Sequence, residues 1–89
     1  MTLMTRIKTP ADNLRALLAR GDLITMPCCF DALSAKLIEQ EGFGLTFMSG
    51  FATSAARIGE PDLGLMSYGE VLDQARNITD AVSIPVIGD

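Results

Sequence analysis

Apolar residues recur at every third or fourth position in three segments of the chain, and this period predicts amphipathic helices. The predicted helices are residues 10–20, 32–40 and 68–82. Each follows a residue whose side chain can accept a hydrogen bond from the first helical turn, namely Thr9, Asp31 and Ser67. Glu70 stands three residues after Ser67, which is the spacing of a capping box.

Three short runs of consecutive apolar residues alternate with these helices, and such runs predict buried strands. The runs are Leu23–Met26, Leu45–Met48 and Ile84–Ile87. Pro27 follows the first run and is expected to end its pairing, because proline has no backbone N–H. Short apolar strands that alternate with helices predict an α/β fold with a parallel sheet covered by helices.

A doubly wound sheet and a (β/α)8 barrel both begin in this order. A nucleotide-binding doubly wound sheet usually carries a glycine-rich phosphate turn after its first strand. Residues 27–30 read Pro-Cys-Cys-Phe instead, which favours the barrel. The 89 residues are then about three β/α units, a partial barrel domain (1–89) truncated at the end of its third strand.

Composition narrows the possible partners. The chain is 48% hydrophobic and 20% charged, which is typical of a folded domain. Its net charge of −4 and the absence of a basic patch argue against nucleic acid and anionic membranes. No apolar run approaches the roughly 18 residues that span a membrane, and residues 1–8 lack the apolar core of a secretory signal. A cytoplasmic protein is expected.

The adjacent Cys28 and Cys29 cannot easily reach disulfide geometry, and no metal-ligand spacing surrounds them. They are expected to be two small buried residues of a strand in a reduced compartment. The sequence contains no histidine, so the commonest acid/base group is missing from any mechanism built on these residues.

Small polar and acidic residues follow the second and third predicted strands, at the ends where parallel α/β folds build their sites. Ser49 and Gly50 follow one strand, and Asp89 ends the next. Gly50 has no Cβ, so the Ser49 hydroxyl and the amides of Gly50 and Phe51 are candidates to hold a carboxylate or an oxyanion. A turn that merely needs small residues remains the simpler alternative.

Residues 50–66 form a long segment rich in small residues, which predicts a functional loop. It contains Asp62, while Asp89 ends an apolar strand, where a carboxylate is costly unless it is paired or bound to metal. Two carboxylates from separate elements suit Mg2+. A turn role for Asp62 is the alternative. Arg57 is a candidate to steady a substrate carboxylate, although a surface role is favoured for it.

Four segments together resemble the N-terminal part of the isocitrate lyase / phosphoenolpyruvate mutase superfamily. They are Pro27–Ala35, Phe47–Gly50, Gly59–Gly64 and Ile84–Asp89. The resemblance implies a (β/α)8 barrel, usually a homotetramer, that binds Mg2+ (with Mn2+ as an alternative). It also implies action on small 2-oxo or 2-hydroxy acids through an enolate-like intermediate, with the metal as Lewis acid.

The resemblance also implies roles for individual residues. The substrate-binding residues would be Phe47, Ser49, Gly50, Phe51 and Asp62, and the metal residues would be Asp62 and Asp89. Asp89 would be the first acid of the family's Asp-x-Asp-x-Gly-[Phe/Tyr]-Gly motif. The second acid and the family's acid/base cysteine, in a Lys-Lys-Cys-Gly-His loop, would follow Asp89. No catalytic residue and no turnover are therefore expected of these 89 residues alone.

The run Pro61–Gly64 resembles carbon–carbon lyases and decarboxylase-like members more than the mutases. Phe51 stands where methylisocitrate lyases usually have glycine, which argues against strict methylisocitrate specificity. The favoured function is a Mg2+-dependent lyase similar to methylisocitrate or dimethylmalate lyases. The alternatives are a carboxyphosphonoenolpyruvate mutase-like or oxaloacetate decarboxylase-like activity, a non-catalytic truncated barrel, or a small doubly wound ligand-binding domain.

Overall fold

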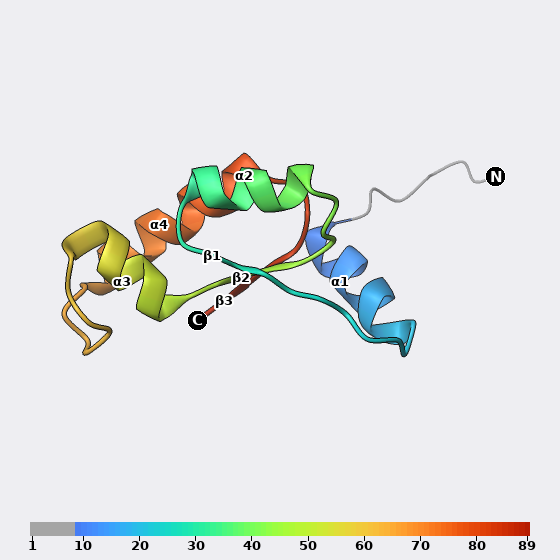
Figure 1. Cartoon of the computed structure of the whole chain (residues 1–89), viewed down its shortest axis with the longest axis horizontal. Helices are drawn as coiled ribbons and strands as arrows, with labels where there is room; N and C mark the ends of the chain where they lie inside the picture. Colours follow the sequence, from blue (N-terminus) through green and yellow to red (C-terminus); the bar gives the residue numbers. More distant parts are fainter. Residues whose placement is uncertain (1–8) are drawn as a thin grey trace.

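The computed structural model describes residues 9–89. The expectation that residues 1–8 form no secretory signal therefore lies outside the described part. Its elements are α1 Pro10–Ala19, β1 Cys28–Cys29, α2 Ala32–Gln40, β2 Thr46–Met48, α3 Gly50–Ile58, α4 Tyr68–Ala81 and β3 Val86–Gly88. Within this range the strands form one parallel sheet in the order β1-β2-β3 (Figure 1). Helices connect successive strands, as in the first units of a (β/α)8 barrel.

The three helices predicted from the apolar period are confirmed, and their start points follow from local hydrogen bonds. Thr9, Asp31 and Ser67 each accept a bond from the backbone N–H three residues later. In each case the side chain at that later position bonds back to the capping residue's N–H, which completes a capping box. Each capping box involves residues only three positions apart, so it can be recognised in the sequence without knowledge of the fold.

The first strand lies later in the chain than the apolar run predicts. β1 is Cys28–Cys29, and Leu23, in the run expected to be a buried strand, is 94% exposed. The expectation that Pro27 ends the pairing is also wrong. Its carbonyl oxygen accepts bonds from the Phe47 N–H at 3.2 Å and from the Thr46 hydroxyl at 2.9 Å. Proline lacks only the donor, and β1 is an edge strand of the described sheet, where that donor is not needed.

Residues 50–66 are not one loop, because their first half forms the helix α3. The Ser49 hydroxyl accepts a hydrogen bond from the Ala52 N–H at 3.1 Å and so caps the start of this helix. The helix ends at Gly59, whose φ of 67° is the left-handed conformation that favours glycine. Only residues 59–67 then remain as an irregular connection before α4.

The third strand is confirmed in position but begins at Val86, two residues later than predicted. The chain enters it through Pro85, whose carbonyl oxygen accepts a bond from the Thr46 N–H at 3.1 Å. Two strands of the sheet are therefore preceded by prolines that contribute carbonyl oxygens to the neighbouring strand.

One face of the sheet is covered by α2 and α4, which pack against each other (Figure 1). The buried core at this face contains Cys29, Met48, Ala35 and Ile78. Burial raises the pKa of the Cys29 thiol, so the thiol stays neutral in this apolar setting.

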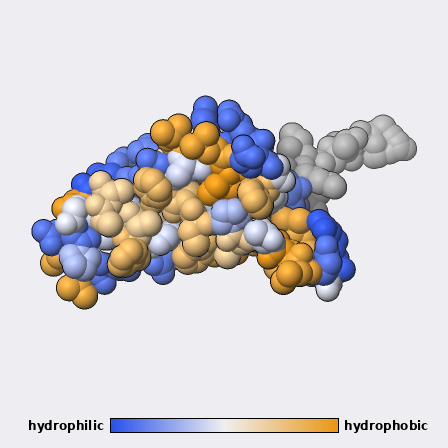
Figure 2. Space-filling view, in the orientation of Figure 1, coloured by the Kyte–Doolittle hydropathy of each residue, from blue (hydrophilic) through white to orange (hydrophobic). Residues whose placement is uncertain are grey.

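The other face of the sheet has the aligned row Cys28, Phe47 and Ile87. Because side chains alternate across a strand, this row points away from α2 and α4, and Cys28 is exposed. The prediction that both cysteines are buried is therefore wrong for Cys28. Figure 2 shows apolar side chains over the middle of this view, where the strands lie in Figure 1, and both hydrophilic and apolar side chains over α2, whose Leu33 and Leu37 are exposed.

In the part of the chain that the structure describes, no helix has the length and apolar character needed to cross a membrane.

Candidate functional site

Three separate elements bring Gly50, Asp62 and Asp89 together at the carboxyl end of the sheet. Gly50 begins α3, Asp62 lies in the connection to α4, and Asp89 follows β3. A Cβ atom placed on Gly50 would collide with the carboxylate of Asp89 and would lie 2.9 Å from Oδ2 of Asp62. Glycine is therefore required at position 50 if both carboxylates are to keep these positions.

These three residues line one cavity of about 330 Å3. Its other lining residues come from β2, α3, the connection before α4, and α4 itself: Met48, Thr53, Ser54, Gly64, Met66 and Val71. The cavity thus has an acidic and hydroxylated side beside an apolar one. Sites for small ligands commonly combine an apolar wall with a few converging polar groups.

The N-terminus of α3 lies at this cavity, and Ser49 precedes it. The Ser49 hydroxyl is already used as the cap of α3, and its carbonyl oxygen accepts the Thr53 N–H at 2.9 Å. The first two amides of the helix, those of Gly50 and Phe51, form no hydrogen bond within residues 9–89. Unpaired amides at a helix start attract anionic oxygen atoms.

Two buried hydroxyl groups of α3 belong to the cavity wall, and the sequence reasoning missed both. Ser54 donates to the carbonyl oxygens of Glu60 at 2.8 Å and Pro61 at 3.1 Å. Thr53 is 1% exposed, and its Oγ1 has no hydrogen-bond partner within the described residues. Both positions fell in a segment predicted to be a loop. Had α3 been recognised, their place one turn after Gly50 would have indicated them.

The carboxylates of Asp62 and Asp89 form no hydrogen bond or ion pair with any of residues 9–89. The same range contains no cluster of three His, Cys, Asp or Glu side chains suited to a metal ion. Two free carboxylates, a close-approach glycine and an orphaned buried hydroxyl nevertheless fit a hydrated divalent cation. Mg2+ in particular binds through one or two carboxylates and keeps several of its waters.

The remaining predicted site residues lie outside the cavity lining. Phe47 projects from the sheet face opposite to that of Met48, its neighbour in β2 that does line the cavity. Phe51 is 69% exposed on α3. Arg57 does not line the cavity either and pairs with Glu70 and Asp73 of α4. The substrate roles of Phe47, Ser49 and Phe51 remain predictions.

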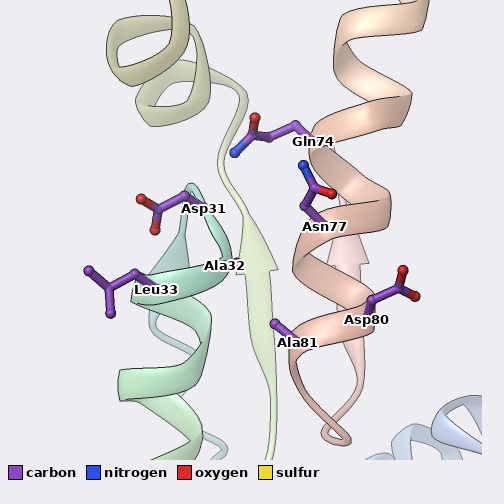
Figure 3. Close-up of a pocket in the computed structure, with 7 residues that line it drawn as sticks. All are labelled: Asp31, Ala32, Leu33, Gln74, Asn77, Asp80 and Ala81. Carbon is purple, nitrogen blue, oxygen red and sulfur yellow. The ribbon is translucent and has the colours of Figure 1, made fainter.

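A second depression, between α2 and α4, shares no lining residue with this cavity (Figure 3). It has a volume of about 480 Å3. Two of its polar groups already serve the fold, since Asp31 caps α2 and Gln74 donates to the Phe30 carbonyl oxygen at 2.9 Å. The convergence of two unpaired carboxylates on Gly50 therefore makes that cavity the stronger candidate for a functional site.

The architecture is that of the first units of a (β/α)8 barrel, and the candidate site lies at the carboxyl ends of its strands. A sequence profile of the family Phosphoenolpyruvate phosphomutase matches residues 14–89. The chain therefore belongs to the phosphoenolpyruvate mutase/isocitrate lyase superfamily.

Two curated relatives illustrate the range of the family. A chloroplastic carboxyvinyl-carboxyphosphonate phosphorylmutase from Arabidopsis thaliana is 42% identical over 82% of this chain and 22% of its own length. A 2,3-dimethylmalate lyase from Eubacterium barkeri is 37% identical over 89% of this chain and 27% of its own length. The chain thus spans about a quarter of the length of these relatives.

Solved structures agree with this assignment. A phosphonopyruvate hydrolase in complex with oxalate and Mg2+ matches with a TM-score of 0.86 and 41% identity, over 92% of this chain and 29% of that one. A 2,3-dimethylmalate lyase matches with a TM-score of 0.78 and 33% identity, over 92% of this chain and 30% of that one. The partial barrel predicted from the sequence is therefore confirmed.

Proposed function

We propose that this chain forms part of the substrate and metal site of a Mg2+-dependent lyase. The enzyme would cleave or form a carbon–carbon bond in a small 2-hydroxy or 2-oxo carboxylic acid. The observation that carries the proposal is the convergence of the unpaired Asp62 and Asp89 carboxylates on Gly50, at the start of α3. The phosphonopyruvate hydrolase that resembles this chain binds oxalate and Mg2+, which supports the same ligand classes here.

In this proposal Asp62 and Asp89 hold the cation, and the amides of Gly50 and Phe51 receive the carboxylate or oxo oxygen atoms of the substrate. When bound, the cation supplies Lewis-acid stabilisation of the negative charge that develops on the substrate. The protein contributes fixed N–H dipoles at the helix start, which need no reorganisation when that charge appears. Ser49 keeps these amides in place because its side chain caps α3.

Membership of the family does not identify the substrate, because the relatives catalyse different reactions. The chain resembles a phosphorylmutase and a dimethylmalate lyase, and it is also 36% identical over 81 residues to an oxaloacetate decarboxylase from Paraburkholderia xenovorans. We favour a lyase similar to the dimethylmalate and methylisocitrate lyases. Mutase-like and decarboxylase-like reactions are the alternatives, and both would use the same acidic site.

The test is an assay of the polypeptide as its gene encodes it, with 2,3-dimethylmalate, 2-methylisocitrate, oxaloacetate and carboxyphosphonoenolpyruvate, with and without Mg2+. We expect Mg2+-dependent turnover of one of these compounds and its loss in Asp89→Asn. Turnover that is unaffected by a chelator and by Asp89→Asn would overturn the proposal.

For residues 1–89 alone we propose that turnover is absent, because two carboxylates provide only part of a metal site. The isolated polypeptide is incubated with Mg2+ and each of the same compounds. Formation of pyruvate from 2,3-dimethylmalate, 2-methylisocitrate or oxaloacetate, or consumption of carboxyphosphonoenolpyruvate, at a rate above the protein-free control would contradict this.

A further inference from the structure

The hydroxyl of Thr53 is buried without a partner although helices offer threonine an easy one. A threonine in a helix commonly bonds to the carbonyl oxygen four residues earlier, which here belongs to Ser49. That oxygen accepts the backbone N–H of Thr53 at 2.9 Å, but the Thr53 Oγ1 bonds to nothing within the described residues. Leaving a buried hydroxyl unpaired is unfavourable, so some other group is expected to satisfy it.

Two further side chains without a hydrogen-bond partner among the described residues line the same cavity as Thr53. Asp62 and Asp89 line it as well, and as ionised carboxylates they only accept hydrogen bonds. Neither of them pairs with Thr53 or with any other described residue. Three unpaired oxygen-bearing side chains from three different elements thus surround one volume of about 330 Å3.

A hydrated divalent cation would satisfy all three side chains at once. Mg2+ loses its waters reluctantly, and these bound waters are hydrogen-bond donors that need acceptors around them. A neutral hydroxyl is a weak ligand for Mg2+ itself but a good acceptor for such a water. We propose that the Thr53 hydroxyl accepts a hydrogen bond from the water layer of the cation held by Asp62 and Asp89, which makes it a positioning residue of the metal site. This inference rests on the proposed function.

The chain permits a closely matched test, because valine has the same shape as threonine without the hydroxyl. Thr53→Val removes only the proposed contact, whereas Thr53→Ser keeps the hydroxyl and removes a methyl group. Asp89→Asn serves as the reference for loss of the metal site. Each variant is made in the polypeptide as its gene encodes it, and the readouts are thermal unfolding without metal and calorimetric titration with Mg2+ alone.

We expect Thr53→Val to unfold at the same or a higher temperature than the unchanged protein, because the lost hydroxyl had no partner. We also expect its dissociation constant for Mg2+ to rise about three- to tenfold, the effect of losing one hydrogen bond. Thr53→Ser should stay within about twofold of the unchanged protein. A purely structural role would instead lower the unfolding temperature and leave Mg2+ binding unchanged.

The outcomes separate this inference from the function on which it rests. If the unchanged protein binds Mg2+, Asp89→Asn does not, and Thr53→Val binds as tightly as the unchanged protein, the inference alone is overturned. If the unchanged protein shows no Mg2+ binding that depends on Asp89, the proposed metal site fails and the role of Thr53 fails with it.

Discussion

The hydroxyl of Ser54 lies 3.1 Å from the carbonyl oxygen of Pro61, the residue that immediately precedes Asp62. The same hydroxyl lies 2.8 Å from the carbonyl oxygen of Glu60. One buried side chain of α3 therefore fixes the backbone of the connection that contains an acidic residue of the site. Asp62 itself has no bond within residues 9–89, so its position depends on this backbone contact.

We expect Ser54→Ala to weaken Mg2+ binding although Ser54 is not proposed as a ligand. Loss of its hydrogen bonds should lower the free energy of unfolding by about 1–2 kcal/mol and let the backbone before Asp62 move. Thr9→Ala is the matched control, because it removes the cap of α1 and costs about 1 kcal/mol far from the cavity. Thermal unfolding and Mg2+ titration are measured for both variants. Equal Mg2+ affinity in the two would contradict the role of Ser54.

Arg57 connects α3 to α4, and we expect its removal to have an effect that depends on salt. Its guanidinium lies 3.1 Å from Asp73, 2.9 Å from Gln74 and 3.7 Å from Glu70. Partly exposed ion pairs contribute little, so Arg57→Ala should lower the free energy of unfolding by about 0.5–1 kcal/mol at low salt. The difference should nearly vanish in about 1 M salt, where charges are screened within a few ångströms.

The control for this prediction is Arg76→Ala in α4. It removes the same charge, but Arg76 has no ion pair within the described residues. Denaturant unfolding at two salt concentrations compares the variants. An identical salt dependence for both would show that the pairs of Arg57 do not stabilise the contact between α3 and α4.

The features that the sequence predicts well are those with local causes. The capping box of Ser67 and Glu70 lies within one helical turn, and α4 begins where it predicts. The approach of Asp89 to the start of α3 follows from topology, because the carboxyl ends of parallel strands meet at one edge of the sheet. Neither inference requires knowledge of packing.

The features that the sequence misses depend on burial and on contacts between distant segments. Leu23–Met26 has the composition of a strand but finds no partner, because the pairing register aligns Cys28 with Phe47. The helix α3 has Phe51, Ala55 and Ile58 at helical spacing, but its many small residues made the segment resemble a loop. The helical position of Thr53 and the bond from Ser54 to the later turn depended on that missed helix.

Glu39 makes the stability of the fold depend on pH. Its carboxylate accepts bonds from the backbone N–H and hydroxyl of Ser83, each at 2.8 Å, and from the Ile84 N–H at 3.2 Å. These bonds, led by that of the Ser83 N–H, hold the pKa of Glu39 below its ordinary value of 4.5. The group thus binds its proton more weakly when folded than when unfolded. Its stabilisation is complete above pH 4.5 and is lost as the pH falls through the folded pKa.

We therefore expect the unfolding temperature of Glu39→Gln to fall less steeply with decreasing pH below 4.5 than that of the unchanged protein. Glu41→Gln is the control, since it removes the same charge from the end of α2 without a hydrogen bond from Ser83 or Ile84. Thermal unfolding between about pH 3 and pH 7 covers the titration of ordinary carboxyl groups. Parallel curves for Glu39→Gln and the unchanged protein would contradict the role of Glu39.

We expect Gly50→Ala to weaken Mg2+ binding with little effect on the stability of the fold. The added Cβ would take the place of the Asp89 carboxylate, which would rotate away because it is the end of a short side chain. Gly50 is the first residue of α3, where alanine gains less over glycine than the roughly 0.5–1 kcal/mol of a helix interior, so the unfolding temperature should change little. The two carboxylates would no longer converge, and we expect the dissociation constant for Mg2+ to rise by about tenfold or more.

Gly69→Ala supplies the control within α4. A Cβ at Gly69 meets nothing nearer than the Ser67 hydroxyl oxygen at 3.9 Å, which is ordinary contact. Gly69 is the second residue of α4, so this variant should gain less than the roughly 0.5–1 kcal/mol of a helix interior and bind Mg2+ as the unchanged protein does. Calorimetric titration with Mg2+ compares the two alanine variants. If both bind equally well, the close approach of Gly50 and Asp89 is not what forms the metal site.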